Sequence, residues 1–390
     1  MKMKKLVSAG LCAALALSMT ACGGGNASTT AAATTAAPAT TAAAEATTAA
    51  DATTATDSTT AGAATTAASA GGNLDLVEKI ECEPIELSLG CSGTVDGTVM
   101  GDAISSGLEE IKKWTDGNFV INFYPSGQLG GDVELIEGAQ MGSVDIFVGA
   151  PTSQVGLIPE LAVLDIAGLF PDVASCNTVL ADFQDQFETY YNKAGLHLLT
   201  IFAPDFRILS SNKPVTTAAD LQGLNIRTQE NKYHMAFWKE LGTNPTPLAF
   251  GELYIALQQG MMDAQENPWA SIVGAKLNEV QKYIVETNHI PFVSTYVMNQ
   301  AKYEGLSDGQ KQALNQFIAY VQDYQVSGTE ADDARMKEIC EKDFSIEVTP
   351  VSDEIKALYP AATQVVIDMM KESIDPAFVD SYVAAAKAAQ

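Results

Sequence analysis

The sequence is poor in basic side chains and, beyond its N-terminus, has no long apolar run. Lysine and arginine together number 22 against 48 acidic residues, which gives a formal net charge of −26. Such an acidic chain is a poor partner for nucleic acid or for an anionic membrane surface. No later segment approaches the roughly 20 apolar residues of a transmembrane helix. The sequence therefore predicts a soluble body, and an anionic ligand would need a local basic cluster.

Motifs for catalysis are also missing. The three histidines, His197, His234 and His289, are scattered, and HExxH, GxSxG, Walker and glycine-rich nucleotide patterns do not occur. The acidic pairs Glu109-Glu110 and Asp332-Asp333 are expected on solvated helix faces. We therefore expect no enzyme, no cofactor and no metal site.

Cysteine is sparse in the part of the chain that follows residue 73. None of these cysteines has the C-x-x-C spacing of a zinc site or the density of a disulfide framework: Cys82, Cys91, Cys176 and Cys340. In an exported protein, Cys82 could pair with Cys340 or with Cys91. The sequence leaves both bridges open, as well as four free thiols.

The N-terminus carries export signals. Residues 1–21 combine a basic start with an apolar stretch too short to span a bilayer, which is typical of a signal peptide. Met19-Thr20-Ala21-Cys22 resembles a bacterial lipobox, although ordinary cleavage after an A-x-A-like site would also fit. We predict lipidation of Cys22, which would anchor the exported protein to the outer face of the cytoplasmic membrane. Residues 22–73, nearly all Ala, Thr, Ser and Gly, are predicted to form a disordered tether.

Short apolar runs then alternate with amphipathic helices. The predicted order begins with a strand, a helix, a strand, a helix and a strand: 85–89, 100–114, 119–123, 135–141 and 144–148. This βαβαβ order is the signature of a parallel sheet covered by helices.

The same α/β alternation restarts further along the chain. After a helix over 183–194, the predicted strands are 196–202, 206–211 and 224–227, and the next helices are 233–241 and 252–259. Ser307 with Gln310 forms a capping box at the start of a helix that continues to about Cys340, roughly 50 Å at 1.5 Å per residue. A strand at 345–348 and two helices complete the chain, so we expect two α/β lobes.

Arginine is rare, which makes each one informative. Arg335 lies among acidic residues of the long helix, and i,i+3 pairing with Asp332 explains it. Arg207 and Arg227 lie in strand-like segments between apolar residues, so their guanidinium groups should be held rigidly. A guanidinium matches a carboxylate with two parallel hydrogen bonds. The spacing alone fits an anion clamp and structural ion pairs equally well.

Several motifs carry a resemblance to a known family. They are Tyr124-Pro-Ser-Gly-Gln-Leu-Gly130, Leu221-Gln-Gly-Leu-Asn-Ile-Arg227, Asn244-Pro-Thr-Pro247, Phe250-Gly-Glu252 and Gln265-Glu-Asn-Pro268. In order and spacing they resemble the solute-binding proteins of TRAP (tripartite ATP-independent periplasmic) transporters, of the C4-dicarboxylate-binding (DctP) type. The resemblance covers residues 83–390 and is strongest between 119 and 270.

The resemblance implies a set of substrate-binding residues. Arg227 matches the family's arginine that binds the substrate carboxylate, Arg207 a second arginine, and Asn267 an asparagine that contacts the ligand. Phe250 would pack on the ligand. The remaining expected contacts come from Trp269 and from the loops of the first lobe: Ser92, Ala150 and Thr152. The loop after Cys91 lacks the His-Pro pair that many members carry there.

The family implies an α/β, two-lobed periplasmic-binding-protein-like (Venus flytrap) fold, with hinge strands and a long helix spanning both lobes. Lobe I would comprise 83–204 plus 293–332, and lobe II 205–292 plus 333–390. A monomer would enclose a small organic acid between the lobes.

The resemblance also implies partners. The receptor would deliver the acid to the small and large subunits of an ion-gradient-driven membrane permease. A receptor for a two-component sensor kinase could use the same site. An ABC-type importer receptor would not carry the motifs above.

Overall fold

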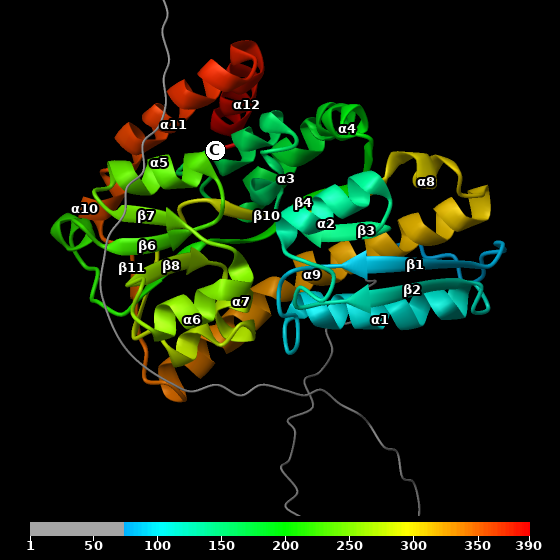
Figure 1. The fold of residues 1–390 in the computed structure, drawn as a ribbon, viewed down its shortest axis with the longest axis horizontal. Helices are drawn as coiled ribbons and strands as arrows, with labels where there is room; N and C mark the ends of the chain where they lie inside the picture. The colour runs from blue at the N-terminus through cyan, green and yellow to red at the C-terminus, as the bar shows by residue number, and fades with distance from the viewer. Residues whose placement is uncertain (1–73) are drawn as a thin grey trace, which may run out of the picture. The chain divides into compact units, whose positions relative to one another are not determined.

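The computed structural model describes residues 74–390 (Figure 1). The predicted signal peptide, Cys22 and the tether lie outside the described residues and stay predictions. Within 74–390, every helix is too short or too polar to cross a bilayer.

The first sheet has five strands in the order β2-β1-β3-β10-β4. Their bounds are β2 (Phe119–Tyr124), β1 (Ile85–Gly90), β3 (Ile146–Gly149), β10 (Pro291–Asn299) and β4 (Leu196–Phe206). β1 pairs in parallel with β2 and β3, whereas β10 runs antiparallel to β3 and β4. The predicted βαβαβ unit is thus confirmed, and a returning strand from late in the chain extends it.

Helices cover both faces of this sheet because its side chains alternate between two cores. Ile146 and Val148 join the hydrophobic cluster formed with α1 (Val99–Trp114) and the long helix α9 (Asp308–Lys342). Phe147 joins the cluster that includes α2 (Asp132–Met141), and α1 and α2 lie on opposite sides of the sheet (Figure 1). The other helices that contact this sheet are α3 (Val173–Asp182), α4 (Gln184–Lys193) and α8 (Gln300–Glu304).

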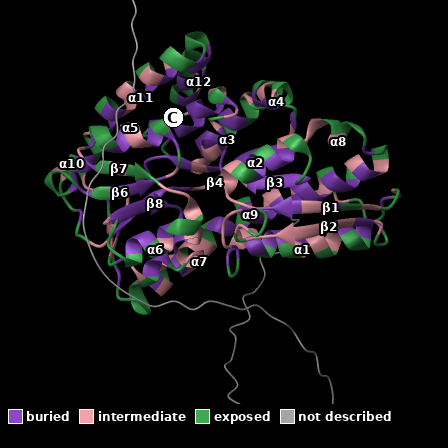
Figure 2. Ribbon diagram, viewed as in Figure 1, coloured by how far each residue is buried: buried purple, intermediate pink, exposed green. Residues whose placement is uncertain are grey.

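The second sheet has six strands in the order β11-β9-β5-β8-β6-β7. Their bounds are β11 (Glu347–Pro350), β9 (Tyr283–Glu286), β5 (Ile208–Ser211), β8 (Ala264–Asn267), β6 (Asn225–Thr228) and β7 (Asn244–Pro247). Its helices are α5 (Lys232–Glu240), α6 (Leu253–Gln258), α7 (Trp269–Gly274), α10 (Asp353–Lys356), α11 (Tyr359–Ser373) and α12 (Pro376–Ala388), although α12 contacts α3. Figure 2 shows buried residues along β3 and β8 and exposed residues on the outer faces of the helices.

The two sheets are joined at a narrow crossing. β4 of the first sheet leads into β5 of the second with only Arg207 between them, and the backbone N–H of Arg207 donates to the Ile290 carbonyl at 2.9 Å. Ile290 immediately precedes β10, which pairs with β4, so two adjacent extended segments cross together. These are the predicted hinge strands.

The long helix contacts elements of both sheets. Ser307 and Gln310 cap α9 reciprocally, which confirms the predicted capping box. α9 then contacts α1 and β4 on one side and α7 and β11 on the other. Its 35 residues correspond to a length of about 52 Å. The exact lobe boundaries stay a prediction.

The cysteines of the described chain are all free thiols: Cys82, Cys91, Cys176 and Cys340. Neither bridge that the sequence left open is formed. Cys91, Cys176 and Cys340 are buried in three different hydrophobic clusters, while Cys82 is partly exposed.

Candidate functional site

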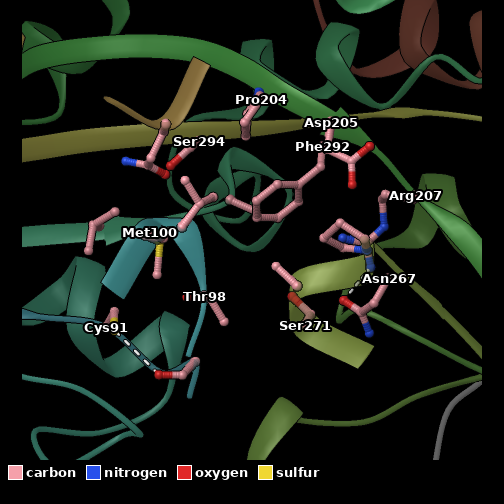
Figure 3. A pocket seen from close by; sticks show the side chains of 18 of the residues that line it. Cys91, Thr98, Met100, Pro204, Asp205, Arg207, Asn267, Ser271, Phe292 and Ser294 are labelled. Carbon is pink, nitrogen blue, oxygen red and sulfur yellow. Dashed lines mark hydrogen bonds between the residues drawn. The ribbon is translucent and has the colours of Figure 1, made fainter. Parts of the chain in front are cut away.

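A cavity of about 110 Å³ lies where the two sheets meet. Cavities of this order hold a single small organic molecule. Figure 3 shows side chains converging on it from separate parts of the chain, including Thr98, Met100, Ser271 and Phe292. The cavity is therefore built by elements of both sheets.

One wall comes from the first sheet. The loop after β1 supplies Cys91, Ser92 and Gly93, and Ala150 follows β3. The Ser92 hydroxyl donates to Oδ1 of Asp132 at 2.6 Å, which ties this loop to the first turn of α2. Burial raises the pKa of Asp132 against the effect of this hydrogen bond.

Arg207 lies at the crossing between the sheets and is 2% exposed. Its Nε donates to Oε2 of Glu266 at 2.5 Å, and its Nη2 donates to Oε1 of Glu266 at 3.1 Å and to Oδ1 of Asn267 at 2.9 Å. Arg207 and Asn267 both line the cavity. The structural ion pair that the sequence left open for this arginine is thus present.

Glu266 is the centre of a buried polar network. It also contacts Nε2 of His289 at 3.2 Å and Nδ1 of His234 at 3.5 Å. Burial raises the pKa of Glu266, but the Arg207 guanidinium and the two imidazoles outweigh it and hold that pKa well below its usual range. β8 is buried although three of its four residues are polar, because these partners satisfy the polar groups.

The network continues to the first half of the chain through Asp165. His234 Nε2 lies 3.0 Å from Oδ1 of Asp165, and Nδ2 of Asn231 donates to Oδ2 of Asp165 at 2.8 Å. Burial lowers the pKa of His234, but Asp165 and then Glu266 reverse this effect and raise the pKa to about 9. His234 is therefore an imidazolium at neutral pH.

Arg227 in β6 is also 2% exposed, but it forms no ion pair with a carboxylate of residues 74–390. Its Nε and Nη2 donate to the Leu248 carbonyl at 2.8 Å and 2.6 Å, and the ring of Phe250 lies 6.0 Å from the guanidinium carbon. Its Nη1 is buried and makes no hydrogen bond within the described chain. Burial lowers its pKa to about 10, so a positive charge with an unsatisfied donor remains at neutral pH.

Comparison with known proteins decides what kind of protein carries this cavity. The family described as "Bacterial extracellular solute-binding protein, family 7" (DctP) matches residues 93–373. The chain belongs to this family. Its members are extracytoplasmic receptors, which confirms the predictions of a binding protein and of no enzymatic activity.

Individual relatives agree with the family 7 assignment. The 2,3-diketo-L-gulonate-binding periplasmic protein of Escherichia coli (strain K12) is 34% identical over 206 residues, 52% of this chain and 63% of the relative. The sugar acid binding protein of Advenella mimigardefordensis, in complex with galactonate, has a TM-score of 0.75 and 26% identity, covering 79% of this chain and 100% of that chain.

A TRAP solute-binding protein of Polaromonas sp. JS666, bound to D-erythronate, has a TM-score of 0.70 and 28% identity, covering 78% of this chain and 98% of that chain. These similarities confirm the TRAP type and the two-lobed α/β fold that the motifs implied.

The cavity of this family 7 protein brings together some of the residues expected from the sequence. Its lining includes five of them: Ser92, Ala150, Arg207, Phe250 and Asn267. Arg227 lies outside the lining, with its guanidinium carbon 6.0 Å from the ring of Phe250. Trp269 and Thr152 lie outside the lining as well. Trp269, the first residue of α7, packs in a hydrophobic cluster with residues of α6. The Thr152 hydroxyl donates to Asp165 at 2.6 Å.

Sequence reasoning missed the contribution of α9. Gln325, Thr329 and Asp333 line the cavity from this helix, at the i, i+4, i+8 spacing that places side chains on one face. The expectation that Asp333 lies on a solvated face was wrong, because this part of α9 passes beneath the cavity. Three polar residues in one stripe of a helix were the available signal.

Proposed function

We propose that the protein captures a small carboxylate in this cavity, with Arg227 as the residue that binds the carboxylate. The observation that supports this role is the buried Nη1 of Arg227, which makes no hydrogen bond within the described chain. A buried charged donor without a partner is costly, and a ligand carboxylate would satisfy it. Because the Leu248 carbonyl occupies Nε and one side of Nη2, the carboxylate would approach the Nη1 end of the fork.

The neighbours of Arg227 favour a carboxylate there. Phe250, which lines the cavity, has its ring 6.0 Å from the guanidinium carbon of Arg227. Arg207 is less suited to a free anion, since Glu266 already neutralises it. We therefore assign Arg207 to positioning Asn267 and Glu266, and Arg227 to the ligand.

The relatives narrow the chemical class of the ligand. Their names or titles include 2,3-diketo-L-gulonate, galactonate and D-erythronate, each a carboxylate with several oxygen substituents. The polar groups that line the cavity, such as Ser92, Asn267 and Gln325, would bind such substituents. We infer a sugar acid or a similar hydroxy carboxylate.

The receptor, as a monomer, would deliver its bound acid to a two-subunit permease of the TRAP type. Lipidated Cys22 would hold the receptor at the membrane. A sensor kinase as recipient would leave the same site unchanged. Uptake of the acid by cells with and without the permease subunits distinguishes these partners.

Isothermal titration with a panel of sugar acids tests the proposal. Arg227→Ala should weaken binding by a factor of tens to thousands, because the loss of one member of a buried charge pair costs about 2–5 kcal/mol. Lys113→Ala removes one positive charge from an exposed side chain and should bind like the wild type. Wild-type affinity in folded Arg227→Ala would contradict the assignment.

A further inference from the structure

Two carboxyl groups face each other in the wall of the cavity. Asp205 lies near the end of β4 and Asp333 in α9, and both line the cavity. Figure 3 shows the Asp205 carboxyl beside Phe292 and near Arg207. Its Oδ2 is buried and has no hydrogen-bond donor in the described chain, while the Asp333 carboxyl lies within hydrogen-bonding range.

Two carboxyl groups in contact bind each other only if they share a proton. Burial, together with the neighbouring Asp205, raises the pKa of Asp333 to about 9, while burial raises the pKa of Asp205 to about 6. The other groups that face the pair are Arg207, Asp332 and the backbone N–H groups of Phe206, which donates to Oδ1 of Asp205, and of Trp269. The pair therefore carries one proton and one negative charge at neutral pH.

Within residues 74–390, the arginines near this charge already have carboxylate partners of their own. Arg207 is bound to Glu266, and Arg335 is bound to Asp332. A third carboxyl, Asp132, also lines the cavity and accepts from the Ser92 hydroxyl. The cavity thus has acceptors and a negative charge around Asp205 and Asp333, whereas Arg227 offers a donor and a positive charge.

We propose that Asp205 and Asp333 are specificity-determining residues, which admit a ligand with one carboxylate and a hydroxyl at its other end and reject a dicarboxylate. A ligand hydroxyl can donate a hydrogen bond to the ionised carboxylate and accept one from the protonated carboxyl, so both groups have a partner. A second carboxylate would bring like charge into a buried site. The inference rests on the proposed function, because it presumes a carboxylate bound at Arg227.

Galactonate and galactarate form a matched pair of probes, since they differ only in a terminal hydroxymethyl group against a carboxylate. Titration calorimetry at pH 7 should give at least tenfold tighter binding of galactonate by the wild type. Asp333→Asn and the double variant Asp205→Asn/Asp333→Asn should reduce this ratio by tenfold or more. Glu341→Gln, an exposed position of the same helix, should leave the ratio unchanged.

The outcomes separate the two proposals. Equal or tighter binding of galactarate by the wild type, or a ratio that the variants leave unchanged, overturns the role of the pair but not that of Arg227. If neither galactonate nor galactarate binds, the same measurement is made with 4-hydroxybutyrate and succinate. If no carboxylate of either pair binds the wild type, the proposed function fails, and this inference with it.

The shared proton can also be tested on the wild type alone, which keeps the proposal testable if the variants fail to fold. Carbon-13 NMR of aspartate carboxyl groups should show one carboxyl of the pair still protonated above pH 7. A spectrum with every aspartate ionised at pH 7 would overturn the shared proton.

Discussion

Nε of Arg207 lies 2.5 Å from Oε2 of Glu266, and both side chains are almost completely buried. The pair lies where β4 leads into β5, and Arg207 also lines the cavity. The ion pair therefore connects the hinge to the cavity. Breaking a buried ion pair by removing one member leaves the other charge without compensation. The stability of the hinge therefore depends on both members together.

Replacement of one member should destabilise the protein strongly. Glu266→Gln is expected to lower the free energy of unfolding by about 3–5 kcal/mol, because Arg207 and His234 would lose their common counter-charge. Urea denaturation measures the change. The double variant Arg207→Met/Glu266→Gln should recover part of the loss, and equal stability of wild type and Glu266→Gln would contradict the interpretation.

His234 should make stability depend on pH. Its pKa is raised to about 9 in the folded chain, so its contribution is fully present below the unfolded value of about 6.5 and is lost as the pH rises through 9. Between pH 6 and pH 9.5 the loss should be up to about 3 kcal/mol.

The measurement is the difference in unfolding free energy between wild type and His234→Gln at several pH values. Taking this difference cancels the effect of the other titrating groups on stability. One of them is Asp333, whose raised pKa also makes the protein less stable as the pH rises. A difference that stays constant from pH 6 to 9.5 would show that His234 is not charged in the folded protein.

Gly107 sets the distance between α1 and α9. A Cβ at this position would lie 2.9 Å from Cε2 of Phe317 and 3.0 Å from Cγ2 of Val321. Because overpacking of a core typically costs about 1–3 kcal/mol, Gly107→Ala should lower the free energy of unfolding by that amount. Gly156→Ala, where a Cβ meets nothing within 4 Å, is the control and should change stability by less than about 0.5 kcal/mol.

The cysteines should respond selectively to alkylation. Burial raises the pKa of Cys91, Cys176 and Cys340 to about 12, whereas Cys82 is only partly buried. Because the thiolate is the reactive form, iodoacetamide at pH 8 should modify Cys82 first among these four, as measured by peptide mass spectrometry. Reductants should leave the melting temperature unchanged, and a drop on reduction would reveal a bridge.

Local patterns in the sequence predicted the elements whose signals are local. β1 and β2 coincide with short segments rich in apolar residues. The capping box of Ser307 and Gln310 identifies the residue at which α9 begins. The i,i+3 pairing of Arg335 with Asp332 was likewise predicted from spacing and is confirmed. These features depend on residues a few positions apart.

The polar strand β8 could not be predicted from its own residues. The segment from Ala264 to Asn267 has neither an apolar run nor alternation, yet all four residues are buried. Its burial depends on Arg207, His234 and His289, which lie far away in the sequence and satisfy Glu266. The difference between the two arginines likewise depends on distant partners. The sequence pattern around them could not show that Arg207 pairs with Glu266 while Nη1 of Arg227 makes no hydrogen bond within the described chain.

By itself, the sequence determined the family, the two α/β lobes and the rarity of arginine, because motifs, periodicity and composition are properties of the chain. Only the tertiary structure decided which arginine has an unsatisfied donor and that Asp333 lies beside Asp205 in the wall of the cavity. The physical reason is that charge, pKa and hydrogen-bond satisfaction in a buried site depend on partners that folding brings together from distant segments.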